Sequence, residues 1–461
     1  MPNTFTGLNM ASNALRSFQR ALDTSGHNIA NVNTPGYSRQ TVTFGPTPSA
    51  AFYSGGGMMA LGTGVTIMSL SRIRDQFLDV RARSNQSDTG RLDTLQNALG
   101  EVQSLYQDAA GGGISDALSG FFSAWSNLAA DPTQSANRLK VQQAAQSLAD
   151  QVRGNYTNLS MIKQQQGQLI NNTLGQIQSL AGRIAELNKS IREQQASGAA
   201  PNDLLDQRDQ TLQQLSQLTD VSANTYADGT LVVSVGGFGL VDAQGANTMP
   251  KGSFDPNTQT VTDGTHTVKI TGGQLAGAMQ SIVSIDGYMS KLDTLANTLR
   301  TQINTLHASG TNAAGNTGVL FFNDANPQTG AANFDLDSAV KTDPNAIVTS
   351  STGASGDGGI ALALSQIADT KIAGLGNRTP GNYYADLITG IGSDVASTQT
   401  SLETQQAVGQ QIQNQIQTVS GVSLDDEMAN MLQFQRSYQA AAKVLSIFDQ
   451  ATQDVINMIH P

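Results

Sequence analysis

Hydrophobic and small residues recur every three or four positions along the first thirty residues of the chain. They are Leu8, Ala11, Leu15, Phe18, Leu22, Ser25 and Ile29. This spacing predicts an α-helix with one apolar face, of the kind that packs in coiled coils. Asn28, Asn31 and Asn33 suit the left-handed end of a helix, and Pro35-Gly36 cannot continue one. The helix is therefore expected to stop near residue 30, and the alternating, β-branched stretch 37–44 predicts a strand after it.

The same alternation closes the chain. Its positions are Met431, Phe434, Tyr438, Ala441, Leu445, Phe448, Thr452, Val455 and Ile459. Ser423 is placed to cap this second helix, with Asp426 at the third helical position and further acids in the first turn, where the helix dipole favours negative charge. The sequence thus predicts a helix with one apolar face at each end of the chain.

The two ends differ in charge. Residues 1–45 hold three arginines and one aspartate, a net charge of +2, whereas residues 410–461 hold two basic and five acidic residues, a net charge of −3. Opposite charges on two helices with apolar faces favour association. We expect the terminal helices to pair antiparallel, either with each other or with those of other copies.

The interior of the chain reads mostly as helix. Apolar periodicity predicts helices over 87–218, with a break at 198–201, and again over 274–308 and 383–419. Short strands separated by Asp-Gly and Gly-Gly turns are expected at 231–235, 240–241 and 265–270. Residues 45–66 are rich in glycine and proline. The expected fold is mainly α, with terminal coiled-coil-type helices, a central bundle of long helices and a small, short-stranded outer β domain.

These elements predict three domains. The first is a terminal helical assembly domain formed by 1–45 and 410–461. The second is a helical core domain formed by 46–220 and 275–409, in which 311–382 is rich in loops. The third is the small β-rich outer domain at 221–274.

The composition and charge exclude some classes of binding partner. Of the 461 residues only 13 % are charged, about half the usual share, and the net charge is −11. Nucleic acid and anionic membranes attract clustered lysine and arginine, which this chain lacks, so neither is expected as a partner. The chain contains no cysteine. We expect neither a cleaved signal peptide nor a membrane anchor.

No motif indicates catalysis or metal binding. The four histidines stand far apart in the sequence, and the glycine runs have no lysine after them. Two Ser-x-x-Lys matches, at 160–163 and 338–341, are expected by chance in a serine-rich chain. We therefore expect no catalytic, cofactor-binding or metal-binding residues, no cofactor and no enzymatic activity.

Two features allow a second interpretation. Asp425, Asp426 and Glu427 could form a metal or acid–base site, but neighbours on a helix point about 100° apart, which favours a role at the helix start. The apolar faces of the terminal helices could likewise be ordinary core. Their place at both chain ends, where a compact monomer has least to cover them, favours an assembly surface.

Both ends carry recognisable signatures. The run from Asn28 to Gln40, NIANVNTPGYSRQ, resembles the N-terminal signature of the bacterial flagellar axial proteins, which include rod, hook and hook-associated proteins. The run from Gly421 to Met431, GVSLDDEMANM, continued by FQRSYQAAAKV from Phe434, resembles their C-terminal signature. Asp426 stands where the family more often has glutamate. The Gly-Val-Ser-Leu-Asp start and the long helical middle are most similar to the hook-associated members.

This resemblance implies a structural protein of the flagellum, outside the cell, that forms the junction ring between hook and filament. It implies self-association in a ring, the hook protein on one side, a second junction protein on the other, a flagellar export chaperone beforehand, and export without a cleaved signal peptide. Alternatives are a hook or rod subunit and, more remotely, a secreted coiled-coil adhesin. The subunit interface is expected to involve Leu8, Leu15, Phe18, Leu22, Ile29, Asn31, Thr34, Pro35, Gly36, Leu424, Met431, Phe434, Tyr438, Leu445, Phe448, Val455 and Ile459.

Overall fold

The computed structural model describes residues 2–54, 57–106, 113–323 and 330–459. The backbone divides into two compact units, each assembled from separate parts of the chain. Unit 1 contains 1–86, 177–249 and 406–461, and unit 2 contains 87–176 and 250–405. The boundaries of these units differ from the boundaries of the three expected domains. The segment 221–274, expected to be one domain, is divided between the two units. The domain boundaries proposed from the sequence stay a prediction.

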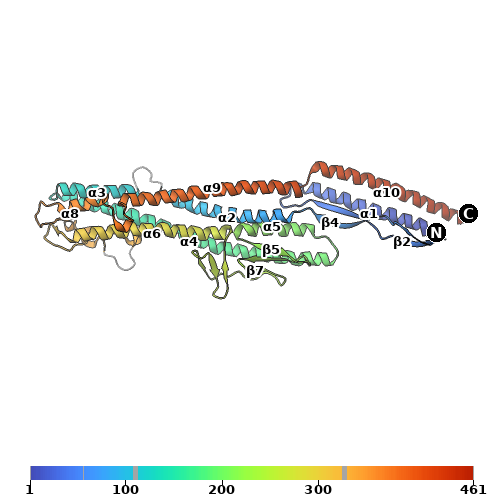
Figure 1. Cartoon of the computed structure of the whole chain (residues 1–461), viewed down its shortest axis with the longest axis horizontal. Coiled ribbons are helices and arrows are strands. Elements are labelled where there is room, and N and C mark those ends of the chain that lie inside the picture. Colours follow the sequence, from blue (N-terminus) through green and yellow to red (C-terminus); the bar gives the residue numbers. More distant parts are fainter. Residues whose placement is uncertain (1, 55–56, 107–112, 324–329, 460–461) are drawn as a thin grey trace. The chain divides into compact units, whose positions relative to one another are not determined.

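Unit 1 holds both ends of the chain (Figure 1). Its elements are α1 (Pro2–Ala30), β1 (Gln40–Pro46), β2 (Ala50–Ser54), β3 (Gly57–Leu61), β4 (Val65–Arg72), α5 (Asn202–Leu218), β5 (Ser222–Thr225), β6 (Leu231–Val235), β7 (Phe238–Val241) and α10 (Leu424–Ile459). Strands β1 and β4 pair antiparallel, β2 and β3 form a hairpin, and β5, β6 and β7 form an antiparallel sheet. The start of α2 (Gln76–Leu105) and the ends of α4 (Ser135–Ala196) and α9 (Pro380–Ser420) complete the unit.

Helices α1 and α10 pack side by side and antiparallel, as the charges and apolar faces predicted. The N-terminal part of α1 lies against the C-terminal half of α10, because a Cβ on Gly7 would be 2.5 Å from the ring of Phe448. Farther along α1, Leu15 lies beside Tyr438 of α10. Gly7 therefore permits a close approach that a larger residue would prevent.

Unit 2 is a helical assembly with short strands. The three long helices that it shares with unit 1 are α2 (Gln76–Leu105), α4 (Ser135–Ala196) and α9 (Pro380–Ser420). Its other elements are α3 (Ile114–Ala130), β8 (Ser253–Asp255), β9 (Thr260–Thr262), β10 (Thr267–Lys269), α6 (Gly273–Ala308), β11 (Thr311–Asn312), η1 (Ala331–Asn333), α7 (Ser338–Thr342), η2 (Pro344–Ala346), β12 (Val348–Ser350), α8 (Gly359–Ser365), η3 (Gln366–Asp369) and η4 (Ala373–Leu375).

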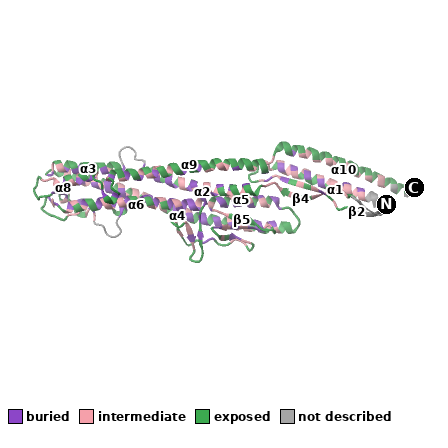
Figure 2. Ribbon diagram, viewed as in Figure 1, coloured by how far each residue is buried: buried purple, intermediate pink, exposed green. Residues whose placement is uncertain are grey.

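The core of unit 2 is built around aromatic rings. Trp125 of α3 is fully buried and lies 5.1 Å, between ring centroids, from Phe321, which in turn lies 5.0 Å from Phe322. Buried side chains of α4, α6 and α9 belong to the same hydrophobic cluster, and Figure 2 shows the buried residues along the helices. The fold is thus mainly α with small antiparallel sheets, which confirms the expected fold class.

Two segments contain more regular structure than their composition indicates. The glycine- and proline-rich stretch 45–66 contains β2, β3 and the start of β4. The loop-rich segment 311–382 contains short helices and the β11–β12 pair. Their strands and helices contain too few residues for a repeating hydrophobic pattern to show. Strands β2 and β3 pair locally as a hairpin, whereas β11 pairs with β12 across a longer stretch of chain.

Candidate functional site

The loop that follows α1 is held closed by one buried asparagine. The side-chain Oδ1 of Asn28 accepts hydrogen bonds from the Gln40 backbone N–H at 2.9 Å and the Tyr37 hydroxyl at 2.8 Å, and its Nδ2 donates to the Gln40 carbonyl at 2.9 Å. The Asn28 amide thus both accepts from and donates to the backbone of Gln40, as two paired residues of an antiparallel β-ladder do. Gly36, at φ +80°, makes the turn that brings the chain back. Burial, followed by nearby acids, raises the pKa of Tyr37, so its hydroxyl stays a donor.

Acidic side chains of α5 bind the end of this loop. Asp206 accepts from the Ser38 backbone N–H at 3.1 Å and from the Ser38 hydroxyl at 2.8 Å. Arg72 bridges two of the acids, since its Nη1 lies 2.6 Å from Asp206 and 2.8 Å from Asp209. Asp203 accepts from the Gln40 side-chain amide at 3.0 Å. Because Arg72, Asp206 and Asp209 are largely buried, each partner stabilises the other's charge, whereas Asp203 is exposed.

Arg74 extends the same network toward the start of α2. It donates two hydrogen bonds to Asp79, at 3.0 and 2.6 Å, and one to Asp209 at 2.9 Å. Burial lowers the pKa of Arg74, but Asp209, Asp79 and Asp206 outweigh burial, so the net shift is upward. The first signature is therefore fixed from two directions, by α5 and by the β4–α2 connection.

A second set of contacts joins the two signatures directly. The Arg39 Nε lies 2.7 Å from Glu427 Oε1, and the Glu427 side chain is only 2 % exposed. The Arg39 backbone N–H also donates to the Ser420 carbonyl at 3.0 Å. The capping expected of Ser423 is present, because its hydroxyl accepts from the Asp426 N–H at 3.3 Å. Glu427, which we expected only to favour the helix start, is instead the buried partner of Arg39.

The apolar faces of α1 and α10 meet as a half-buried seam. Phe44 of β1 bridges them, with its ring centroid 5.7 Å from Phe18 and 6.0 Å from Phe434. The seam residues of intermediate exposure are Leu8, Leu15, Phe18, Leu22, Ile29, Met431, Phe434, Tyr438, Leu445 and Phe448. Within one copy the two ends of the chain thus cover much of each other's apolar face.

The other residues expected at the interface lie differently. Thr34, Pro35 and Gly36 are exposed at the loop, and Leu424 is 47 % exposed at the start of α10. Asn31 is half-buried and donates to the His27 carbonyl at 3.0 Å. The side chains of Val455 and Ile459 lie outside the described residues.

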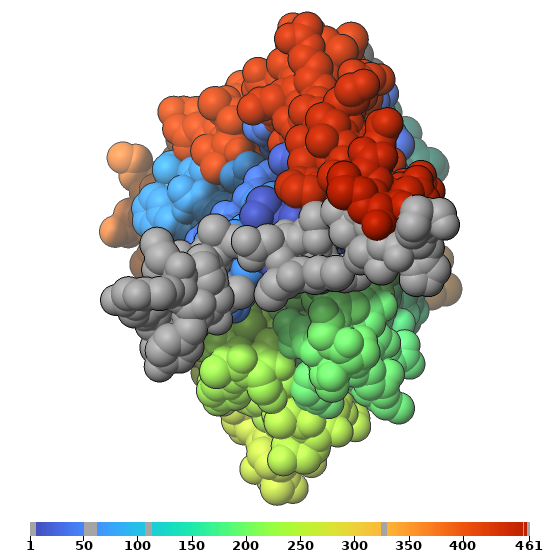
Figure 3. All heavy atoms as spheres, turned by 90° about the vertical axis from the view of Figure 1, so that its right-hand side faces the viewer, coloured from blue at the N-terminus to red at the C-terminus, as the bar shows by residue number. Residues whose placement is uncertain are grey.

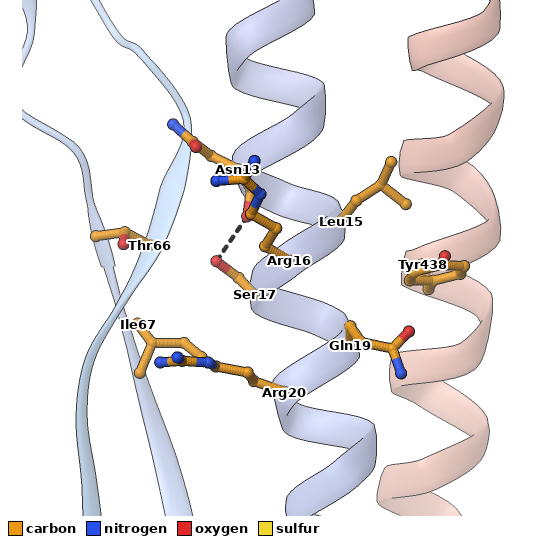
Figure 4. Close-up of a pocket in the computed structure, with 9 residues that line it drawn as sticks. All are labelled: Asn13, Leu15, Arg16, Ser17, Gln19, Arg20, Thr66, Ile67 and Tyr438. Carbon is orange, nitrogen blue, oxygen red and sulfur yellow. Dashed lines mark hydrogen bonds between the residues drawn. The ribbon is translucent and has the colours of Figure 1, made fainter. Parts of the chain in front are cut away.

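A groove of about 560 Å³ runs between α1, β4 and α10 (Figure 4). Leu15 and Gln19 face Tyr438 across it, whereas Arg20 lies beside Ile67 of β4. Arg16 and Arg20 are exposed, and neither guanidinium has a carboxylate within 4 Å among the described residues. The groove therefore carries two positive charges without negative partners.

The outer face of α10, opposite the seam, carries exposed hydrophobic side chains among charged ones. Figure 3 shows α10 on the surface over α1, and Figure 2 shows its outer side exposed. The large hydrophobic side chains on the side opposite the seam that are at least 43 % exposed are Met428, Leu432, Val444, Ile447 and Met458. Exposed hydrophobic side chains in this number are typical of a surface that another protein covers.

Sequence reasoning missed the acids of α5. Asp203, Asp206 and Asp209 recur every three residues and so share one face of the helix. Arg72 and Arg74 alternate, as two residues on one side of a strand do. This spacing was a visible signal of a charged network, although nothing in it identifies the signature loop as the partner.

Known proteins resemble this chain along its whole length. Residues 99–322 match the family described as the flagellar hook-associated protein FlgK helical domain. Residues 8–37 match the flagella basal body rod protein family, and 413–458 match the flagellar basal body rod FlgEFG protein C-terminal family. The two terminal matches include residues 28–37 of the first signature and all of the second.

Two relatives and one solved structure are informative. Flagellar hook-associated protein 1 of Bacillus subtilis is 28 % identical over 507 residues, covering 99 % of each chain. The protein of that name from Salmonella typhimurium is 25 % identical over 554 residues, covering 98 % of this chain and 99 % of its own. The flagellar hook junction protein FlgK from Burkholderia pseudomallei superimposes with a TM-score of 0.62 at 18 % identity, over 74 % of this chain and all of that one, which indicates a shared fold.

Proposed function

Because this chain belongs to the family of flagellar hook-associated proteins, we propose that its copies form a ring at the junction between hook and filament. It is a structural component of the flagellum and not an enzyme. No helix in the described part of the chain is long and apolar enough to cross a membrane. The proposed surroundings of the ring are the hook protein on one side and a second junction protein on the other.

The outer face of α10 carries the proposal. Its inner face already packs on α1, yet hydrophobic side chains such as Met428 and Ile447, each 58 % exposed, remain uncovered. Burying a fully exposed side chain of this size contributes roughly 1.5–3 kcal/mol, and covering one that is 58 % exposed contributes about half of that. A neighbouring copy would cover this face, so the paired ends of one chain become the unit that assembles.

Export fits the same arrangement. We propose that the chain leaves the cell through the flagellar export apparatus without a cleaved signal peptide, and that a chaperone covers the uncovered α10 face beforehand. The protein would then reside outside the cell at the hook–filament boundary. Labelling of a single band at that boundary would support this location, and continuous labelling of the hook would contradict it.

Substitutions on the two faces of α10 test the assembly. Ile447→Asp changes the uncovered face, so we expect a folded monomer, an absent ring and lost motility. Leu445→Asp changes the seam with α1, so it should block the ring and also disturb α1–α10 pairing while sparing the core of unit 2. The measurements are circular dichroism of the purified monomer, and swarming and electron microscopy of cells that make only the variant.

A matched control separates assembly from surface chemistry. Leu362 on α8 is 51 % exposed and lies away from the terminal helices in the sequence. Cells that make only Leu362→Asp should swarm like cells that make the native protein. Normal filaments in cells with Ile447→Asp would contradict the proposed role of the outer α10 face.

A further inference from the structure

A cavity in unit 2 has walls that are polar but almost uncharged. It has a volume of about 490 Å³ and lies between the start of α4, residues 311–315 after α6, and residues 345–355. Its lining consists of hydroxyl, amide, glycine, alanine and proline residues together with one charged side chain, Arg138. No aspartate or glutamate is among the residues described as lining it.

Arg138 is a buried cation held by neutral groups. Its side chain is 4 % exposed; Nη1 donates to the Ile347 carbonyl, and Nη2 donates to the Pro132 carbonyl at 3.0 Å and the Thr349 hydroxyl oxygen at 3.2 Å. Across the described ranges, no carboxylate lies within 4 Å of it. Arg72 and Arg74, by contrast, are each paired with acids.

Two further effects disfavour a lone positive charge here. Burial lowers the pKa of Arg138, and no acid offsets this shift. Arg138 also lies in the first turn of α4, where the helix dipole is positive and repels a cation. A negative group in the adjoining cavity would relieve both effects.

We propose that this cavity binds an oxyanion, a phosphate or carboxylate group, with Arg138 as its cationic anchor. Three of the five guanidinium N–H donors of Arg138 are used, which leaves two for a ligand. The Thr349 hydroxyl oxygen already accepts from Arg138, so its own proton is available. Asn312 accepts two backbone bonds through Oδ1, and its side-chain NH₂ has no acceptor among the described residues.

Thermal unfolding of the full chain tests the site. Sodium phosphate and sodium acetate are each compared with sodium chloride at equal ionic strength and pH 7. We expect at least one oxyanion to raise Tm in a saturable manner. A response to phosphate alone indicates a phosphoryl ligand, and a response to acetate as well indicates that a protein carboxylate can fill the site. Equal Tm values in all three salts would overturn the proposal.

Variants separate the site from general salt effects. Arg138→Met should abolish the Tm response, whereas Arg183→Met, which removes an exposed arginine elsewhere on α4, should retain it. If Arg138→Met fails to fold, the Tm response of Thr349→Asp tests the proposal instead, because this substitution places a carboxylate beside the guanidinium. It should raise Tm without added anion and remove the response. A lower Tm with an unchanged response would refute the role of Arg138.

Discussion

At the scale of single residues, His307 shows how burial fixes a protonation state. The imidazole is fully buried; its Nδ1 lies 2.7 Å from the Val319 carbonyl, and its Nε2 accepts the Val348 backbone N–H at 2.9 Å. The proton therefore belongs on Nδ1. A second proton on Nε2 would face the N–H of Val348, and burial lowers the pKa of His307 from 6.5 to about 4.

This shift predicts acid sensitivity. Between pH 6.5 and about 4 the unfolded chain binds a proton on His307 that the folded chain does not, so the free energy of unfolding falls as pH falls. The slope approaches about 1.4 kcal/mol per pH unit in that window. His307→Gln can keep both hydrogen bonds without titrating, and should flatten the slope. Urea unfolding from pH 4 to 7 measures it; identical slopes in the two proteins would contradict the assignment.

At the scale of elements, the Arg39–Glu427 pair links the residue just before β1 to the start of α10. Each single change, Arg39→Met or Glu427→Gln, leaves a largely buried group without its partner and should cost about 3 kcal/mol or more of unfolding free energy. The double variant should cost less than the sum of the two. Chemical denaturation of all four proteins gives this coupling.

An exposed ion pair supplies the comparison for that cycle. Lys163 and Asp286 are 41 % and 46 % exposed, so their coupling should stay below about 1 kcal/mol. Equal coupling in the two cycles would mean that burial adds nothing to the link between the signatures.

The same scale shows what sequence can predict. Helix α6 begins at Gly273 and ends at Ala308, in agreement with the helix predicted over 274–308. Apolar residues that recur every three or four positions through about ten turns fit a helix and no strand. The partners of Arg39 could not be predicted in this way. Glu427 is 388 positions away, and neither residue differs in its local pattern from a solvated charge.

At the scale of the whole molecule, the paired α1 and α10 leave charges unmatched on both helices. Arg16 and Arg20 line the groove of α1, while Asp425, Asp426, Asp449 and Asp454 are exposed on α10. In the described residues none of these four carboxylates forms an ion pair with an arginine or lysine. Since the helices already lie together, their opposite charges are available for a second copy.

The unmatched charges predict that the groove on α1 helps to orient neighbouring copies during assembly. If the acids of one copy approach the groove of the next, Arg16→Gln combined with Arg20→Gln should reduce ring formation and motility while leaving the helix content of the monomer unchanged. Charged pairs at an interface set orientation more than affinity, so a reduced number of correctly capped hooks is expected rather than complete loss. Electron microscopy counts them. Arg183→Gln, which changes an exposed arginine of α4, should assemble normally, and an equal defect in both proteins would place the effect outside the groove.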